Sequence, residues 1–378
     1  MRELDGSKAG GQFVRTALTL SVLENEPVRL ENVRGDRPDP GLAHQHLAVL
    51  ETMAELCDAD ASGADLGAET IEFDPGLSDE GGSGNGNGGN SGTARLGGGS
   101  YAVDIGTAGS VTLLFDALLP LAAVLESPLS VAVTGGTDVA WSPPLDYARQ
   151  VKLPLLGRYG LVASCEVDRR GFYPDGGGRA TLRLAPSTLE SLDLAERGDL
   201  EGVRLYSTES ASLADRDVAH RQLEGALERL DLAGARSGDG DSDESGSAGG
   251  LEVLERQERT AASPSPGSAL VIRVDHGTGI AGFSALGERG KPAERVGEDA
   301  ADAANRFLEA SAAVDPHMGD QLLVYLALAG GRVRLPAVTD HVETSRELLA
   351  SFGLETVLER ERDGEAIVSL ESAPLLSP

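Results

Sequence analysis

The stretch Gln12–Val33, QFVRTALTLSVLENEPVRLENV, indicates the fold class. Its first part, Gln12–Leu23, has apolar residues at helical spacing, and Pro27–Val33 alternates apolar and polar residues as a strand does. A second amphipathic helix over Gly41–Cys57 and a strand over Thr70–Phe73 follow. Helices and strands that alternate in this way predict an α/β protein.

The same rhythm recurs further along the chain. Its recurrence predicts an α/β architecture built from duplicated units. The further helices of this pattern are predicted over Val111–Leu125, Pro143–Tyr159, Gly297–Ala312, Leu322–Ala329 and Val342–Phe352. The further strands are predicted over Tyr101–Ile105, Leu129–Thr134, Arg332–Pro336 and Ala366–Leu370.

The segment 189–283 departs from the rhythm and has elements of its own. We expect it to form a small insert domain within a large domain made of residues 1–188 and 284–378. Two stretches rich in Gly, Ser, Asn and Asp, 78–99 and 235–250, are predicted to be flexible surface loops. The elements predicted for the insert are strands over Glu201–Thr208 and Ala269–Asp275 and a helix over Leu213–Leu230.

The composition bounds the class of protein. A chain of 378 residues with 40% hydrophobic residues fills a large core, which excludes a disordered or fibrous protein. The formal net charge is −29, and only three of the 32 basic residues are Lys. We interpret this balance as adaptation to a cytoplasm rich in salt, where screening removes self-repulsion. The alternative is an acidic surface for a basic partner. In either case, a phosphate site has to be built locally from Arg.

The chain shows no signal for a membrane or for secretion. No apolar run approaches the roughly 20 residues that cross a bilayer, and the first residues lack the apolar core of a signal peptide. We therefore expect a cytoplasmic protein. Cys57 and Cys165 lack any metal-binding spacing and are predicted to be reduced core thiols.

Among the six histidines, His341 has the strongest case for a chemical role. It lies in LPAVTDHVETSREL, where Asp340 and Glu343 have the spacing of a capping box that opens a helix. A neutral imidazole on the first turn, beside free backbone N–H groups that hold a phosphate, suggests phosphoryl or nucleotidyl transfer. The alternative is a solvated histidine at a helix start. No histidine pair has the spacing of a zinc site.

His317 lies in DPHMGDQLL, ahead of another apolar helix. Asp320 and Gln321 beside it could hold an adenosine, a ribose or a metal ion, or they could cap the helix. Three glycine-rich turns begin at Gly10, Gly106 and Gly135. None fits a Rossmann or P-loop pattern, although each could present backbone amides to a phosphate.

An arginine cluster near the N-terminus is more informative. Arg15 falls on the first helix, and Arg34 and Arg37 lie in the turn NVRGDRPDPGL. Gln45 follows on the second helix, with a histidine on each side. In so acidic a chain, arginines between Gly and Pro are typical of a phosphate clamp, with surface solubility as the alternative.

Taken together, these segments resemble the RNA 3′-terminal phosphate cyclase family. The matching blocks follow the family's order, span nearly the whole chain and end with the segment around His341. The blocks are LDGSKAGGQFVRTALTLS (4–21), NVRGDRPDPGLAHQHL (32–47), GTAGSVTLL (106–114), TGGTDVAWSPP (134–144), GFYPDGGG (171–178) and DPHMGDQLLVYLALAGG (315–331).

The resemblance implies an enzyme that uses ATP and a divalent metal, Mg²⁺ or Mn²⁺, to convert an RNA 3′-phosphate into a 2′,3′-cyclic phosphate, releasing AMP and diphosphate. A histidine is adenylated on the way, and by position it is His341. The resemblance also implies repeated units, each a four-stranded sheet with two helices, and a small α/β insert. Its partner is RNA with a 3′-phosphate end, because only RNA has the attacking 2′-hydroxyl. The oligomeric state stays open.

The resemblance assigns further residues by position. The segment that contacts adenosine falls on His317, Met318, Gly319, Asp320 and Gln321. The polar groups that serve the terminal phosphate and ATP fall on Gln12, Arg15, Arg34, Arg37 and Gln45.

Three positions depart from the family pattern. The first loop is shortened, and Lys8 stands near a position that is usually Glu. Asp116 replaces a Gln that contacts the nucleotide, so it belongs to the expected ATP site, where it could change base contacts or recruit a cation. His317 replaces a residue that is often Tyr, and it could also stack on adenine.

Two alternatives remain on sequence grounds. The first is a non-catalytic relative that acts in ribosome biogenesis or RNA binding. Such relatives lack the nucleophilic histidine, so the presence of His341 with Arg15, Arg34 and Arg37 favours the enzyme. The second is a carboxyvinyl transferase built from similar repeated units, which would not need an adenylated histidine.

Overall fold

The computed structural model describes residues 1–77, 95–106, 109–233, 251–361, 364–371 and 374–375. The predicted loop 235–250 and most of the predicted loop 78–99 lie outside these residues. Within the described part, no helix has both the length and the apolar character needed to span a membrane.

The α/β class is confirmed, and three sheets repeat one strand order. The orders are β1-β2-β4-β3, β5-β6-β8-β7 and β9-β14-β16-β15, and in each sheet the first pair is parallel and the other two are antiparallel. The duplicated rhythm expected from the sequence therefore corresponds to three units of four strands each.

The three units have the following bounds. The first consists of β1 (Arg2–Asp5), α1 (Gly11–Glu24), β2 (Val28–Glu31), α2 (His44–Cys57), β3 (Asp60–Ser62) and β4 (Ile71–Asp74). The second consists of β5 (Gly99–Asp104), α3 (Val111–Leu118), β6 (Leu129–Gly135), α4 (Leu145–Tyr147), α5 (Leu153–Gly157), β7 (Ala163–Arg169) and β8 (Gly178–Leu184). The third consists of β9 (Leu192–Leu194), α8 (Pro316–Ala329), β14 (Gly331–Leu335), α9 (Asp340–Ser351), β15 (Thr356–Arg360) and β16 (Ala366–Leu370).

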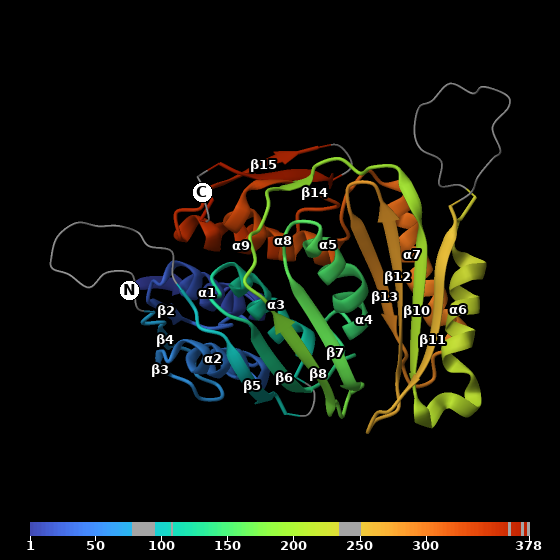
Figure 1. Ribbon diagram of the computed structural model, residues 1–378, viewed down its shortest axis with the longest axis horizontal. Coiled ribbons are helices and arrows are strands. Elements are labelled where there is room, and N and C mark those ends of the chain that lie inside the picture. Colours follow the sequence, from blue (N-terminus) through green and yellow to red (C-terminus); the bar gives the residue numbers. More distant parts are fainter. Residues whose placement is uncertain (78–94, 107–108, 234–250, 362–363, 372–373, 376–378) are drawn as a thin grey trace.

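A fourth sheet interrupts the third unit between β9 and α8. Its strand order, β11-β10-β12-β13, differs from that of the repeated units, and Figure 1 shows it with α6 and α7 at one end of the molecule. Its elements are β10 (Leu200–Ser210), α6 (Val218–Arg229), β11 (Val253–Ala261), β12 (Ser268–His276), β13 (Ile280–Leu286) and α7 (Ala293–Glu309).

The expected insert limits, 189 and 283, differ from this pairing at both ends. β9 pairs with β14 and so belongs to the third repeated sheet. At the other end, Ala300, Ala304 and Phe307 of α7 are buried in the apolar cluster of the insert sheet. The apolar face of α7 therefore packs on the insert. Whether the insert is an independent domain stays a prediction.

The helices between the sheets carry the main apolar core. α1 is buried on most of its surface, including Phe13, Val14, Leu18 and Leu20, and Figure 1 shows it among the other helices rather than on an outer face. Burial of so many apolar side chains is the principal stabilising contribution to such a helix. Its first turn is therefore held by a rigid element.

Proline sets the end of one predicted helix. The helix expected over Val111–Leu125 is α-helical only to Leu118 and continues as a short 3-10 turn over Leu119–Ala123. Pro120 lacks the N–H that an α-helix needs.

A buried ion cluster joins the second unit to the insert. Arg170 donates to Asp138 at 2.9 Å and to both carboxylate oxygens of Asp146 at 3.0 and 2.7 Å. Thr208 of β10 also donates to Asp146, at 2.9 Å. Because these charged groups are nearly completely buried, their partners have to stay in place.

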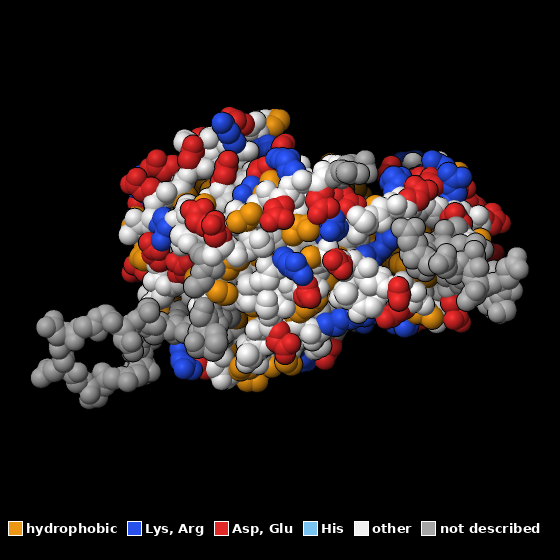
Figure 2. Space-filling view, turned by 90° about the horizontal axis from the view of Figure 1, so that it is seen from above, with side chains coloured by type: hydrophobic (Ala, Val, Ile, Leu, Met, Phe, Trp, Pro, Cys, Tyr) orange, Lys and Arg blue, Asp and Glu red, His pale blue; other side chains and the backbone are white. Residues whose placement is uncertain are grey.

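The acidic surface agrees with the sequence expectation, and of the two predicted core thiols Cys57 is buried while Cys165 is half-buried. Asp and Glu are dispersed over the face in Figure 2, with Lys and Arg between them. Cys57 and Cys165 are both free. Burial raises the pKa of the Cys57 thiol to about 12, so this thiol stays protonated.

Candidate active site

His341 lies on the first turn of α9. The N-cap is Thr339, whose Oγ1 accepts a hydrogen bond from the Val342 N–H at 3.2 Å. Asp340, expected as the capping residue, is instead the first helical residue, because the extended backbone lies at Thr339 (φ −89°, ψ 164°). The imidazole of His341 is exposed.

The start of α1 faces the same space. Gly10 is the N-cap of α1, and a Cβ at this position would lie 3.6 Å from Cε1 of His341 and 3.3 Å from Nη2 of Arg37. The structure therefore brings the predicted nucleophile and one predicted phosphate ligand together beside a residue without a side chain. Backbone N–H groups at two helix starts and a guanidinium create a site that attracts anions.

Asp320 joins this site from α8. Its Oδ1 accepts a hydrogen bond from Thr339 Oγ1 at 2.9 Å, so the residue that caps α9 also holds this carboxylate. Burial raises the pKa of Asp320, while the bond from Thr339 and the nearby His341 and His317 act in the opposite direction. The carboxyl group of Asp320 therefore lies within electrostatic range of both histidines.

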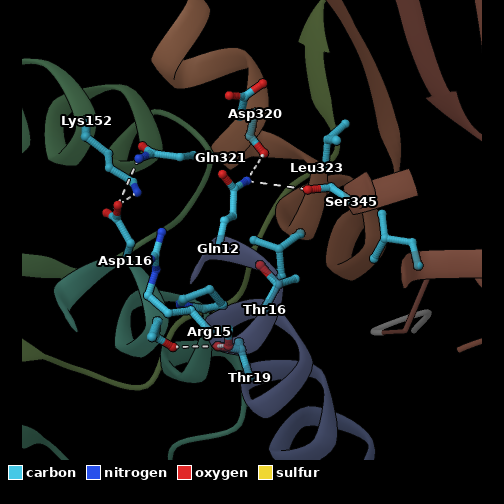
Figure 3. Close-up of a pocket in the computed structure, with 14 residues that line it drawn as sticks. Gln12, Arg15, Thr16, Thr19, Asp116, Lys152, Asp320, Gln321, Leu323 and Ser345 are labelled. Carbon is cyan, nitrogen blue, oxygen red and sulfur yellow. Dashed lines mark hydrogen bonds and ion pairs between the residues drawn. The ribbon is translucent and has the colours of Figure 1, made fainter. Parts of the chain in front are cut away.

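Gln12 connects α1 to the two C-terminal helices. Figure 3 shows its amide turned toward Asp320 and Ser345. Nε2 donates to the carbonyl oxygen of Asp320 and to Oγ of Ser345, each at 3.4 Å. The predicted ligand Gln12 therefore also fixes α1 relative to α8 and α9.

A narrow polar cavity extends from Gln12 toward α3. Its volume is about 40 Å³, which has room for water and is too small for a nucleoside. Asp116 forms an ion pair with Lys152, and its Oδ2 accepts a hydrogen bond from Gln321 Nε2 at 2.8 Å. Figure 3 shows these three side chains turned toward one another. Both carboxylate oxygens of Asp116 therefore have a partner, and Lys152 is its direct ion-pair partner.

Arg15 reaches the same cavity from α1. Burial lowers the pKa of its guanidinium to about 10, and the charge of Asp116 opposes this shift. Within the described residues, the guanidinium of Arg15 forms no hydrogen bond or ion pair. A guanidinium of this kind is available to an anionic ligand.

Comparison with known proteins identifies the family. The sequence model described as RNA 3'-terminal phosphate cyclase matches residues 7–357. The chain belongs to this family. The RNA 3'-terminal phosphate cyclase of Halobacterium salinarum (strain R1) is 43% identical over 369 residues, which cover 98% of this chain and 100% of that protein. The protein of the same name from Methanopyrus kandleri is 39% identical over 370 residues, 96% of each chain.

A solved structure gives only a weak likeness. The enolpyruvyl transferase NikO from Streptomyces tendae has a TM-score of 0.24 and 12% identity, and the match covers 100% of this chain and 66% of that one. A score this low supports no conclusion about fold or activity.

The cyclase-family assignments place two more residues near the helix starts. Arg34 has a left-handed backbone (φ 55°), and its Nη1 donates to the carbonyl oxygen of Gly41 at 2.8 Å, so it braces its own loop. Gln45 lies on the first turn of α2 and is half-buried, and its side chain has no hydrogen bond with the residues described. Their roles toward phosphate stay predictions.

The adenosine segment of the family divides into two kinds of residue. His317 is exposed, with its ring edge-on to Tyr147 at a centroid distance of 6.2 Å. Met318 is completely buried, and a Cβ at Gly319 would lie 2.9 Å from Leu335. The side chain of Met318 and the close approach at Gly319 therefore serve packing. Any role of these two residues toward adenosine stays a prediction.

Asp315 fixes the start of α8, which carries the adenosine segment. It accepts hydrogen bonds from the Met318 N–H at 3.0 Å, from the Tyr147 hydroxyl at 2.9 Å and from the Gly282 N–H at 2.9 Å. These donors come from α8 itself, from the second unit and from the insert. One buried carboxylate thus connects three parts of the fold.

Sequence reasoning missed the roles of Lys152 and His46. Lys152 is 2% exposed, and the only signal in the sequence was that Lys is so rare. His46 is buried, and its Nδ1 accepts from the Ala43 N–H at 3.2 Å. A Cβ at Gly11 would lie 2.0 Å from His46 Nε2, so only glycine fits there. This contact brings the starts of α1 and α2 together.

Proposed function

We propose that this protein converts an RNA 3′-terminal phosphate into a 2′,3′-cyclic phosphate, using ATP and an adenylated His341. Membership of the cyclase family supports the reaction type. The observation that carries the mechanism is the exposed His341, which lies beside Gly10 and Arg37 where α1 and α9 begin. An accessible nucleophile beside anion-binding groups suits nucleotidyl transfer.

The proposed reaction has three steps. A ring nitrogen of His341 attacks the α-phosphorus of ATP, the bond to the β-phosphate oxygen breaks and diphosphate leaves, while the imidazole loses its other ring proton to solvent. An oxygen of the RNA 3′-phosphate then attacks the same phosphorus and breaks the P–N bond, and the imidazole takes up a proton from solvent as it leaves. Finally, the 2′-hydroxyl attacks the 3′-phosphorus, loses its proton and releases AMP. The last step is intramolecular, so the reacting groups are already close.

The described residues suit these steps. Arg15, Arg34 and Arg37, with Gln12 and Gln45, would bind the RNA phosphate and the phosphates of ATP. His317, Asp320 and Gln321 would contact the nucleoside. Asp116 would act on ATP through Gln321, whose amide it holds.

A divalent metal would enter with ATP. The described residues contain no group of three or more His, Cys, Asp and Glu that could hold an ion alone. Mg²⁺ or Mn²⁺ bound to nucleotide phosphates usually needs only one or two carboxylates, and Asp320 offers one beside His341. When bound, the metal would neutralise phosphate charge.

The alternative is a non-catalytic relative that binds RNA. His341 favours the enzyme, because a scaffold would not need an exposed histidine at the junction of two helix starts.

Conversion of RNA by the purified protein tests the proposal. An oligoribonucleotide with a 3′-phosphate, incubated with ATP and Mg²⁺ or Mn²⁺, should gain a 2′,3′-cyclic end that resists phosphatase. The matched DNA oligonucleotide should not cyclise, because it lacks the 2′-hydroxyl. RNA that is bound but never cyclised would instead support the scaffold.

A further inference from the structure

Trp141 is an exposed aromatic residue that the proposed chemistry does not use. It is the single Trp of the chain, and its exposed fraction is 91%, the largest among the exposed large apolar residues. Its backbone has φ 63°, in the left-handed region that bulky residues rarely adopt. Strained positions of this kind persist when the surrounding structure fixes them, and they cluster at functional sites.

The loop that carries Trp141 is rigidly supported. Asp138 forms the buried ion pair with Arg170, and its carbonyl oxygen accepts from the Tyr173 N–H at 3.2 Å. The Thr137 N–H donates to the carbonyl oxygen of Gly171 at 2.8 Å. The exposed indole is therefore held outward by an ordered loop.

Tyr173 gives Trp141 an aromatic neighbour. The two rings meet edge to face, with centroids 6.2 Å apart and planes at 86°, and Tyr173 is itself 52% exposed. Arg169, at the base of the hairpin that carries Tyr173, donates to the carbonyl oxygen of Gly177 at 2.7 Å. Within the described residues, Arg169 has no carboxylate partner. Exposed aromatic ring faces, and guanidinium groups that no carboxylate neutralises, are features that bind unpaired nucleic acid.

Trp141 occupies a position in the second unit that corresponds to the positions of predicted site residues in the other two units. Trp141 follows β6, as Arg34 and Arg37 follow β2 and His341 follows β14, and these three strands occupy the same place in their sheets. Tyr173 lies at the same edge, because Gly178 of the next strand pairs with Gly135 at the end of β6. The second unit therefore carries aromatic rings at the position in the repeat where the first unit carries arginines and the third unit carries His341.

We propose that Trp141, with Tyr173 at its edge, stacks on an unpaired base of the RNA substrate upstream of its 3′-phosphate. This inference rests on the proposed function and adds to it a contact with a nucleobase. Stacking accepts every base, since every base has a π face. The pair would therefore favour single-stranded 3′ ends over paired ones without selecting a sequence.

The single Trp makes the proposal directly measurable. Fluorescence excited at wavelengths beyond the absorption band of the six tyrosines reports on Trp141 alone, and a short single-stranded RNA with a 3′-phosphate should quench it. The same RNA with abasic sites at its last three nucleotides should quench it much less. The Trp141→Ala variant should bind the intact RNA about 10-fold more weakly, and Trp141→Phe should bind nearly as well as the wild type. Val162→Ala removes an exposed apolar side chain (56% exposed) at the opposite end of β7, and it should change nothing.

The opposite results would overturn the proposal. Unchanged RNA affinity in Trp141→Ala, or equal quenching by abasic RNA, would exclude base stacking. Quenching by ATP without RNA would place adenine there instead. A change in molecular mass for Trp141→Ala in sedimentation would indicate a contact between two copies. Labelling of the protein by ATP without RNA tests the proposed function separately, and it should be the same in the wild type and in Trp141→Ala.

Discussion

His46 shows how burial of one imidazole contributes to stability near the candidate site. Burial lowers its pKa from 6.5 to about 3, and Arg15 and Arg34 act in the same direction. The folded protein therefore keeps the ring neutral, while the unfolded chain binds a proton below about pH 6.5. The stabilising contribution is complete above that pH and is lost as the pH falls toward 3.

This linkage can be measured with a conservative variant. Between pH 7.5 and 5.5, His46 should account for about 1.4 kcal/mol of the lost free energy of unfolding. His46→Asn retains an acceptor for the Ala43 N–H and should lose correspondingly less over this range. Urea unfolding at both pH values measures the difference, with exposed His44→Gln as the control. Equal pH dependence in the wild type and His46→Asn would contradict this account.

The ion pair Asp116–Lys152 should also contribute to the free energy of unfolding. Lys152→Met removes the direct ion-pair partner of the Asp116 carboxylate, which should lower the free energy of unfolding by about 3 kcal/mol. Asp116→Gln combined with Lys152→Met removes both charges and should recover at least half of this loss. Denaturant unfolding of the wild type, Lys152→Met, Asp116→Gln and the double variant completes a double-mutant cycle. Additive losses would show that the two residues are energetically independent.

The sequence predicts features that depend on neighbouring residues and misses those whose partners are distant. The helix start at His341 could be predicted from the polar residues next to it, while its chemical role stays a prediction. The roles of Lys152 and His46 depend on Asp116 and Gly11, which lie 36 and 35 positions away. No pattern within a window of helix or strand length contains such pairs.

At the scale of elements, Thr339 couples the cap of α9 to Asp320. Thr339→Val removes both hydrogen bonds of the hydroxyl at constant shape. We expect the free energy of unfolding to fall by about 1 kcal/mol. The rate of adenylation should fall by a larger factor than this free energy corresponds to, because His341 lies on the turn that loses its cap. Thr339→Ser retains the hydroxyl and should restore both. Thermal unfolding and single-turnover labelling by ATP measure the two effects.

Two results would contradict this role of the Thr339 hydroxyl. If Thr339→Ser were as slow as Thr339→Val, the hydroxyl would not be the cause. If adenylation did not change in Thr339→Val, the position of His341 would not depend on this cap.

The long helices of the first unit were easier to predict than many of the strands. The amphipathic α1 and α2 agree with their sequence patterns to within a few residues. β3 and β9 have three residues each, too few to show alternation, and were not predicted. The longer strands β7, β8, β11 and β13 were not predicted either. Because β9 was not predicted, the expected insert began at residue 189, ahead of this strand. The expected insert ended at residue 283, ahead of α7, although α7 packs on α6. Both limits depend on tertiary contacts that periodicity does not contain.

At the scale of the whole molecule, the charge of −29 predicts dependence on salt. We propose that the protein works in a salt-rich cytoplasm. Raising KCl from about 0.1 to 2 M shortens the Debye length from about 10 Å to less than about 3 Å, so repulsion between the dispersed carboxylates should fall. The melting temperature should therefore rise over this range and unfolding should become more cooperative. A melting temperature that fell with KCl would contradict a halophilic adaptation.

Covalent labelling of His341 by ATP tests the proposed reaction most directly. After incubation with α-labelled ATP and metal, the tryptic peptide of residues 335–346, which contains no other histidine, should carry one adenylyl group. His341→Ala should form no adduct and remain folded, while exposed His44→Ala should be labelled like the wild type. An adduct of equal yield in His341→Ala, or one on another peptide, would contradict the account.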